Sequence, residues 1–464
     1  MTDPNKTIIS GAPGAIDPNR TQMVPGGLGD PNRTQAMTGL DPTRTTALQL
    51  GPTLTAELLC SREATMANGP AREQFLLDIS AGGSPGLHAG AGARTPLNLC
   101  LVIDRSGSME GAPLEYVKQA CSYVVDLLTP NDVLSIVTFE ETVDVLMSPQ
   151  RVTNKQPIKD GIARLEAGNT TNLYDGLALA LQQVVQSNES SRATRMVVLS
   201  DGDPTVGIKD YSALVQHAAN IKAQGVTVTF LGFGPDYNEE LLAGMAKKAG
   251  GNYYFIPRPE LIPEIFRTEL EKLMTVVARN LTLHLKTARW VSLRAAPGVA
   301  SSPGDREFSF PLADLERGAT LSQVLDFDFN NHPLGHYRVA EGRLTFEDCL
   351  NGRQETIPLD FVVEFTADEA RYSVAPNPKV SQAAQLQMAS RTVEKTIMGL
   401  KTQQITSAMA VAELQKTQAL LLQQGRTADA QEVTMALRAI QSGDTGSAEK
   451  TLMGTMHHLD QGKH

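Results

Sequence analysis

Four short apolar runs alternate with helix-like stretches between residues 96 and 275, and this alternation constrains the fold more than any other feature of the sequence. The runs span 97–104, 133–139, 196–200 and 226–233. The helix-like stretches, with apolar residues at helical spacing, span 114–128, 173–186, 211–223 and 239–249. Strands that are apolar throughout are typically buried on both faces, so the alternation predicts a parallel sheet with helices on both sides.

Apolar and polar residues alternate with a period of two between residues 278 and 370. Examples are Leu281, Leu283 and Leu285, then Leu325, Phe327 and Phe329, and finally Leu359, Phe361, Val363 and Phe365. This period is typical of strands with one buried face and predicts an antiparallel β-sandwich. Residues 54–80 share the pattern, so we expect them to return across the α/β domain and complete the sandwich.

The C-terminal part of the chain has a helical composition. No aromatic residue follows Tyr372, and Gln, Ala, Leu and Met dominate. We expect helices over about 380–424, 427–441 and 444–458, with Gly425 and Gly443 ending the first two.

The predicted architecture is an α/β fold of Rossmann-like type with a mostly parallel sheet, an antiparallel β-sandwich, a C-terminal helical segment and a disordered N-terminal tail. The expected boundaries are 1–50 for the tail, 51–93 for strands joining the sandwich, 94–277 for the α/β domain, 278–374 for the sandwich and 375–464 for the helical segment.

The N-terminal tail consists of irregularly spaced repeats. Residues 1–50 contain no aromatic residue, and 12 of them are Pro or Gly, so the stretch cannot bury enough apolar area to offset the entropy of ordering. Four copies of Asp-Pro-Asn/Thr-Lys/Arg-Thr end at Thr7, Thr21, Thr34 and Thr45. Their uneven spacing favours short linear motifs over a solenoid, which needs a fixed and longer period.

The charge and cysteine content exclude several classes of function. Lys and Arg number 41 against 51 Asp and Glu, a formal net charge of −10. A nucleic-acid or anionic-membrane partner needs a dense cationic face, so neither is expected. No run of about 18 apolar residues occurs, and the N-terminus lacks a signal-peptide pattern. The four cysteines are far apart and fit reduced thiols, so we expect a cytoplasmic protein.

Short oxygen-bearing side chains follow two of the apolar runs and precede one helix-like stretch. In open α/β sheets, ligands bind outside the carboxyl ends of the strands. We therefore expect one cation to be held by Asp104, Ser106, Ser108, Thr171 and Asp201. All five donors are oxygen, which suits a small hard cation such as Mg²⁺, with Mn²⁺ or Ca²⁺ as alternatives.

Each of these segments, taken alone, also has a structural explanation. Ser106 and Ser108 could cap a helix, and Asn172 with Asp175 fits a capping box. The three segments in register at strand ends favour the metal site.

The order Asp-x-Ser-x-Ser, Thr-Asn-Leu and Ser-Asp-Gly resembles the von Willebrand factor type A (VWA) domain and its metal-ion-dependent adhesion site (MIDAS). The likeness continues through 232–234 and 251–254, and the whole chain resembles bacterial proteins in which a β-sandwich follows the VWA domain. The resemblance implies hydroxyl ligands from Ser106, Ser108 and Thr171, and carboxylates from Asp104 and Asp201, directly or through water. Two carboxylates nearly neutralise a divalent ion, so an exposed Asp or Glu of a protein partner could replace a bound water.

The repeat threonines each follow a basic residue, and an aliphatic residue lies three positions after the last three of them. This pattern resembles phosphothreonine ligands of forkhead-associated (FHA) domains. We expect a Ser/Thr kinase to phosphorylate Thr7, Thr21, Thr34 and Thr45 and an FHA-domain protein to bind them, with four copies adding avidity. The alternatives are an inert duplicated linker and a tail whose Asp occupies the metal site in cis as an inhibitor.

Two common catalytic motifs are missing from the sequence. Neither a Gly-x4-Gly-Lys-Ser/Thr loop nor a His-Glu-x-x-His pair occurs, and His457-His458 is too isolated in the sequence to predict a ligand cluster. A metal-assisted hydrolase is the alternative, but its site offers no general base besides the ligands. We therefore expect a non-enzymatic, metal-dependent protein-binding adaptor.

Overall fold

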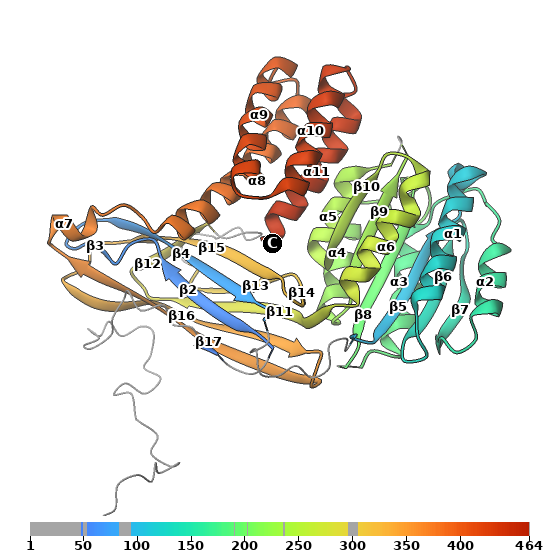
Figure 1. Ribbon diagram of the computed structural model, residues 1–464, viewed down its shortest axis with the longest axis horizontal. Coiled ribbons are helices and arrows are strands. Elements are labelled where there is room, and N and C mark those ends of the chain that lie inside the picture. The colour runs from blue at the N-terminus through green and yellow to red at the C-terminus, as the bar shows by residue number, and fades with distance from the viewer. Residues whose placement is uncertain are drawn as a thin grey trace, which may run out of the picture.

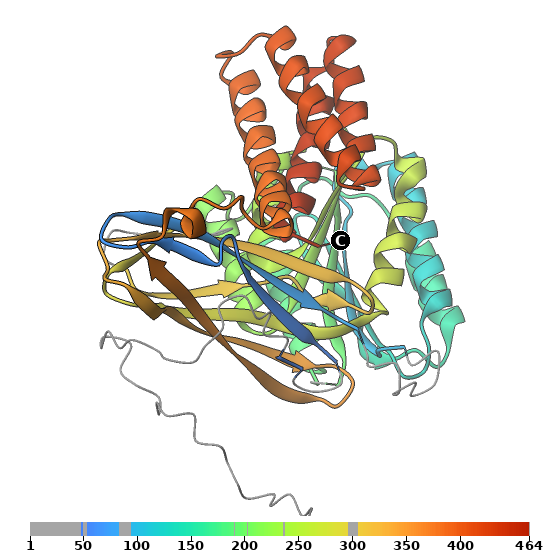
Figure 2. The same cartoon turned by 60° about the vertical axis from the view of Figure 1, so that its left-hand side comes forward.

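The computed structural model describes residues 48–49, 53–82, 94–189, 191–201, 203–234, 237–295 and 305–463. A β-sandwich, an α/β domain and a helical bundle lie side by side, with the bundle above the other two (Figures 1 and 2). The repeat threonines lie outside the described residues. Strand β1 (Leu48–Gln49) falls within the range expected for the tail and pairs with the sandwich.

A six-stranded sheet forms the centre of the α/β domain, in the order β10-β9-β8-β5-β6-β7. All pairs are parallel except β6 with the edge strand β7. The strands are β5 (Leu97–Asp104), β6 (Val133–Phe139), β7 (Val143–Arg151), β8 (Ala193–Ser200), β9 (Thr227–Phe233) and β10 (Gly250–Ile256). Strands β5, β6, β8 and β9 are buried along their whole length, which confirms the predicted parallel sheet.

Helices cover both faces of this sheet. The core on one face joins the sheet to α3 (Leu173–Val185), α4 (Tyr211–Ala223) and α5 (Glu239–Ala249). The core on the other face joins it to α1 (Ala112–Leu127), α2 (Lys155–Ala163) and α6 (Ile262–Leu273). The short 3-10 turns are η1 (Gly107–Met109) and η2 (Pro259–Leu261).

The sandwich is built from segments on both sides of the α/β domain in the sequence. One sheet has the order β1-β2-β4-β15-β12 and the other β13-β11-β16-β17-β3, with β14 beside β11. The bounds are β2 (Thr55–Cys60), β3 (Ala64–Met66), β4 (Ala71–Ser80), β11 (Val276–Thr287), β12 (Val291–Ala295), β13 (Glu307–Pro311), β14 (Leu315–Glu316), β15 (Thr320–Phe329), β16 (Gly335–Asp348) and β17 (Arg353–Thr366). Strand β4 pairs with β15 along its full length, which confirms that residues 54–80 return to complete the sandwich.

The helical bundle contains four long helices after the short α7 (Glu369–Tyr372). They are α8 (Pro378–Lys401), α9 (Ser407–Gln423), α10 (Thr427–Gln441) and α11 (Thr445–Gln461). The expectation of one helix over 380–424 is wrong, because the chain turns between α8 and α9. Thr406 caps α9 by accepting a hydrogen bond from the amide of Met409, and Gln403 has a φ of 56°. Gly399 permits the turn to pack closely, since a Cβ there would lie 2.9 Å from Ile405.

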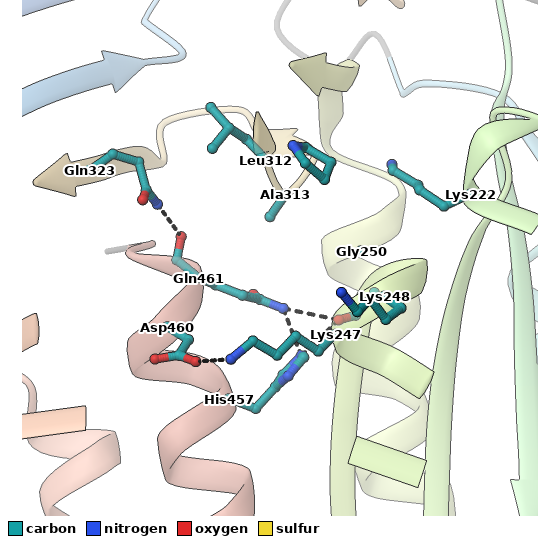
Figure 3. Close-up of a pocket in the computed structure, with 12 residues that line it drawn as sticks. Lys222, Lys247, Lys248, Gly250, Leu312, Ala313, Gln323, His457, Asp460 and Gln461 are labelled. Carbon is teal, nitrogen blue, oxygen red and sulfur yellow. Dashed lines mark hydrogen bonds and ion pairs between the residues drawn. The ribbon is translucent and has the colours of Figure 1, made fainter. Parts of the chain in front are cut away.

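The end of α11 contacts both other units. His457 Nε2 donates a hydrogen bond to the carbonyl of Gly251 at 2.8 Å, and Gln461 donates to the same carbonyl at 3.0 Å (Figure 3). The amide of Ser322 on β15 donates to the carbonyl of Gly462 at 2.9 Å. The bundle is therefore fixed beside the α/β domain rather than joined to it by a free linker. Among the described residues, none of the helices combines the length and hydropathy needed to cross a bilayer.

Candidate metal centre

The loops at the carboxyl edge of the parallel sheet contact one another. The amide of Gly168 donates to the carbonyl of Arg105 at 2.6 Å, and the amide of Thr205 donates to the carbonyl of Thr171 at 2.9 Å. The loop after β5 therefore meets the loop before α3, which in turn meets the loop after β8. This is the edge at which parallel α/β sheets bind their ligands.

Asp104 is the buried end of the candidate site. It is the last residue of β5 and its side chain is fully buried. Its carboxylate accepts one hydrogen bond from the amide of Ser106 at 2.9 Å and another from the hydroxyl of Ser200 at 2.5 Å. Burial raises the pKa of Asp104 to about 7, and the nearby charge of Asp201 raises it further, although the hydrogen bonds from Ser106 and Ser200 lower it. A cation beside this carboxylate would favour its ionised form.

A chain of hydrogen bonds runs from Ser106 to Asp201. The hydroxyls of Ser106 and Ser108 lie 3.2 Å apart, and Ser108 donates to Asp201 Oδ1 at 2.7 Å. Ser106 stands at the N-cap position of η1 but makes no side-chain cap hydrogen bond. The capping explanation therefore does not account for the hydroxyl of Ser106, which faces a second hydroxyl instead.

Thr171 lies on the adjoining loop. Its side chain is buried, its amide donates to Thr205 Oγ1 at 2.8 Å, and its neighbour Asn172 caps α3 by accepting from the amide of Asp175. Only the N-cap half of the capping box predicted at Asn172 is present, because Asp175 Oδ2 accepts from the side-chain amide of Asn172 and the backbone amide of Asn172 donates to the carbonyl of Glu140. The hydroxyl of the preceding residue, Thr170, is buried and has no hydrogen-bond partner among the described residues. It is therefore the alternative hydroxyl ligand on this loop.

An ion pair holds the loop before α3 in place. Arg105 contacts Glu140 at 2.9 Å, and Glu140 accepts a hydrogen bond from the amide of Asn169 at 3.0 Å. A Cβ at Gly168 would lie 1.8 Å from Glu140 Oε2, so a larger residue here would displace this carboxylate from its contacts. The loop is therefore positioned by charge and by close approach rather than by apolar packing.

Hydrogen bonds join the side chains of Ser106, Ser108 and Asp201, and the amide of Ser106 joins this group to Asp104. Thr171, the fifth predicted ligand, lies on the adjoining loop. Two further residues of the site, Ser200 and Thr205, were not assigned a role from the sequence. Ser200 was part of the Ser-Asp-Gly segment, whereas Thr205 carries no signal in the sequence that would single it out.

The donor set fits a small hard divalent cation. Two carboxylates and three hydroxyls supply oxygen only, with no imidazole or thiolate among the five. Asp104 and Ser106 are buried whereas Ser108 is exposed, so a cation held here would have a side facing solvent. That side is where a water or an incoming carboxylate could bind.

Comparison with known proteins identifies the domain that carries this site. The family model of the von Willebrand factor type A domain matches residues 98–268. The protein sll0103 of Synechocystis sp. is 29% identical over 283 residues, which cover 58% of this chain and 67% of that protein. YfbK of Escherichia coli is 28% identical over 294 residues, covering 62% of this chain but 45% of YfbK. Bovine inter-alpha-trypsin inhibitor heavy chain H4 is 29% identical over 164 residues, 18% of its length.

Two solved structures share the fold beyond this domain. A von Willebrand factor type A protein from Catenulispora acidiphila has a TM-score of 0.66 at 16% identity, covering 84% of this chain and 90% of that one. The ArnB paralog VWA2 from Sulfolobus acidocaldarius has a TM-score of 0.61 at 17% identity, covering 87% and 98%. VWA domains in general are metal-dependent protein-interaction modules that act through a MIDAS. The chain therefore contains a VWA domain at residues 98–268 and shares its fold with VWA proteins of Catenulispora acidiphila and Sulfolobus acidocaldarius.

Proposed function

We propose that this chain is a non-enzymatic adaptor that binds Mg²⁺ through Asp104, Ser106, Ser108, Thr171 and Asp201 and uses the ion to capture a protein partner. The observation that carries the proposal is the set of hydrogen bonds at the carboxyl edge of the sheet: Asp104 accepts from the amide of Ser106, and the hydroxyls of Ser106 and Ser108 lead on to Asp201. Mn²⁺ and Ca²⁺ have the same ligand preference and are the alternative ions.

The exposed side of the site determines the chemistry of the partner. Ser108 is exposed and Asp104 is buried, so the ion's open position would face solvent. An exposed Asp or Glu of the partner would replace a water there and complete the coordination with a third negative charge. Removal of the ion would leave two carboxylates facing the partner's own, and the contact would become repulsive.

The ligand assignment is tested by a matched pair of substitutions that remove one hydroxyl at constant shape. Thr171→Val should weaken Mg²⁺ binding by about tenfold or more, the loss typical when a metal site loses a supporting group. Thr170→Val should leave the affinity within about twofold. Isothermal titration of the metal-free protein measures both. The reverse order of effects would move the hydroxyl ligand to Thr170.

Capture of the partner is tested in lysate of the native host with immobilised chain. Bound protein should be released by EDTA, restored by Mg²⁺ and lost with Asp104→Ala, whose fold is checked by circular dichroism. Capture that persists in EDTA would refute metal-dependent binding.

We further propose that the tail links this adaptor to phospho-signalling in the cytoplasm. A Ser/Thr kinase would phosphorylate Thr7, Thr21, Thr34 and Thr45, and an FHA-domain protein would read them. Strand β1 (Leu48–Gln49), which follows the last repeat threonine in the sequence, joins the edge of the sandwich, a different domain from the one with the proposed metal site. The four cysteines are free, as a reducing compartment permits.

Phosphopeptide mapping of the protein from its native host tests the role of the tail. Phosphate at two or more of the four threonines, with capture of an FHA-domain protein that phosphatase abolishes, would support the proposal. Unmodified threonines under all growth conditions would refute it. Deletion of residues 1–50 also tests the cis-inhibitor alternative, which requires a rise in partner affinity.

A further inference from the structure

The helical bundle brings together a second group of metal-ligand side chains, far in the sequence from the candidate MIDAS. Asp429 and Glu432 are one turn apart on α10, and His458 lies in the last turn of the neighbouring α11 (Figure 1). One ligand atom from each of the three lies within 4.8 Å of the other two. We propose that Asp429, Glu432 and His458 form a zinc site that joins α10 to α11.

The distances between these side chains suit a bridging ion better than direct contacts. His458 Nδ1 lies 3.6 Å from Glu432 Oε1 and 3.9 Å from Asp429 Oδ1, both beyond hydrogen-bond range. Bonds of 2.0–2.1 Å around a tetrahedral Zn²⁺ place its ligand atoms about 3.3 Å apart. The two distances to His458 Nδ1 exceed this spacing by about 0.3 and 0.6 Å, and the two carboxylate oxygens lie within 4.8 Å of each other, so small side-chain rotations would bring the three ligand atoms around one ion.

Each carboxylate uses one oxygen for a supporting contact and directs the other toward His458. Asp429 Oδ2 accepts from Arg426 Nε at 2.6 Å, and Glu432 Oε2 accepts from the hydroxyl of Thr455 at 2.9 Å. Supporting hydrogen bonds of this kind orient the ligands of protein metal sites. The arrangement leaves one free oxygen on each carboxylate, and both face the same ring nitrogen.

An aromatic contact positions the ring of His458. The ring makes an edge contact with Tyr254 of β10, with centroids 5.9 Å apart, and its Nε2 is buried with no partner among the described residues. The other ring nitrogen, Nδ1, is the one that faces the two carboxylates, and it is the proposed ligand atom.

The surrounding charges select among cations. Arg426 and Lys272 also face the cluster, so its carboxylates are already balanced and the site does not attract cations by charge alone. Mg²⁺ and Ca²⁺ depend on several oxygen donors, whereas Zn²⁺ binds strongly to few ligands that include imidazole. This chemistry favours zinc and separates the site from the all-oxygen MIDAS.

Competition between the protein and a chromophoric zinc chelator tests the site in the full chain. Asp104→Ala removes a ligand of the proposed MIDAS, so zinc bound by that variant reports the bundle site. We expect one equivalent of Zn²⁺, and we expect His458→Gln in the same background to weaken its affinity by at least tenfold. The absence of bound zinc, or an affinity that His458→Gln does not change, would overturn the proposal.

Matched variants separate ligation from a structural role. Glu432→Gln keeps the shape of the side chain and the oxygen that accepts from Thr455, and it should weaken zinc binding at least tenfold. If His458→Gln misfolds, Glu432→Gln becomes the decisive test. His336→Gln is the control, because His336 lies on the sandwich and faces a single carboxylate at 3.3 Å. This substitution should leave the zinc affinity unchanged. Lys272→Gln removes a facing cation and should tighten zinc binding by a few fold. A loss of affinity in Lys272→Gln would contradict the charge argument.

Discussion

Replacing Asp104 with asparagine should stabilise the metal-free protein at alkaline pH, although it removes the most buried donor of the proposed MIDAS. The carboxylate has no exposed surface, and its pKa is about 7 instead of the ordinary 3.8. The folded protein therefore binds this proton about a thousandfold more tightly than the unfolded chain does. When the pH rises and the proton leaves, the folded protein has to bury a charged carboxylate, which costs free energy.

The size and sign of the effect follow from this difference. Because the folded state binds more protons than the unfolded state between about pH 4 and pH 7, the stability of the metal-free protein falls as the pH rises through that range. The raised pKa of Asp104 costs the folded state about 4 kcal/mol at pH 8 and about 2 kcal/mol at pH 5, at 1.36 kcal/mol for each tenfold change in proton affinity. At pH 8 this is the cost of ionising the buried carboxyl, and at pH 5 it is the cost of keeping protonated a group that is ionised in the unfolded chain. The amide of Asp104→Asn carries no charge, and it can still accept from Ser106 and donate to the hydroxyl of Ser200.

Hydrogen exchange in EDTA at pH 5 and pH 8 measures this stability where it arises, at the amides of β5. Tryptophan fluorescence would not report on β5, because the single tryptophan, Trp290, packs against the sandwich core. We expect slower exchange in Asp104→Asn than in the wild type, with a larger difference at pH 8. Mg²⁺ at a hundredfold excess over its Kd should stabilise the wild type by about 2.7 kcal/mol and the variant much less. Faster exchange in the variant at pH 8, or equal differences at both pH values, would refute the reasoning.

Three further predictions concern the contacts that hold the units together. Asp314 lies between the α/β domain and the sandwich, and the Arg195 guanidinium keeps the pKa of its carboxyl low although burial opposes this. Asp314→Ala should cost about 3–5 kcal/mol in urea unfolding at pH 7, and the cost should shrink below about pH 4, where the unfolded chain binds a proton at Asp314 that the folded carboxylate does not. Gly251→Ala should lower the thermal midpoint by several degrees in calorimetry, because its Cβ would lie 2.1 Å from the carbonyl oxygen of Val228; an unchanged midpoint would mean that β10 shifts freely. Lys401→Ala removes the ion pairs between the end of α8 and two glutamates at the start of α5, so limited proteolysis should cut the α8–α9 turn faster. An unchanged cleavage rate would mean that apolar contacts alone hold the bundle on the α/β domain.

The sequence alone determined the elements whose signal is local. Helices α4 and α5 begin and end at the residues predicted from periodicity, because each has a side-chain cap at its start, Asp210 and Asn238, and apolar residues at helical spacing. The long helix predicted over 380–424 failed at a point where the break depends on Ile405 packing against Gly399. A contact of that kind is not visible in a pattern of polar and apolar residues.

The sequence also placed four of the proposed MIDAS ligands, Asp104, Ser106, Ser108 and Asp201, at one edge of the sheet, because they stand at or just after the carboxyl ends of two parallel strands. Only the tertiary structure decided which groups surround them, such as Ser200 against Asp104, and it alone placed Asp429 and Glu432 beside His458. Periodicity and capping act over a few neighbouring residues, whereas these neighbours are brought together by the packing of separate elements, which the order of residues does not reveal.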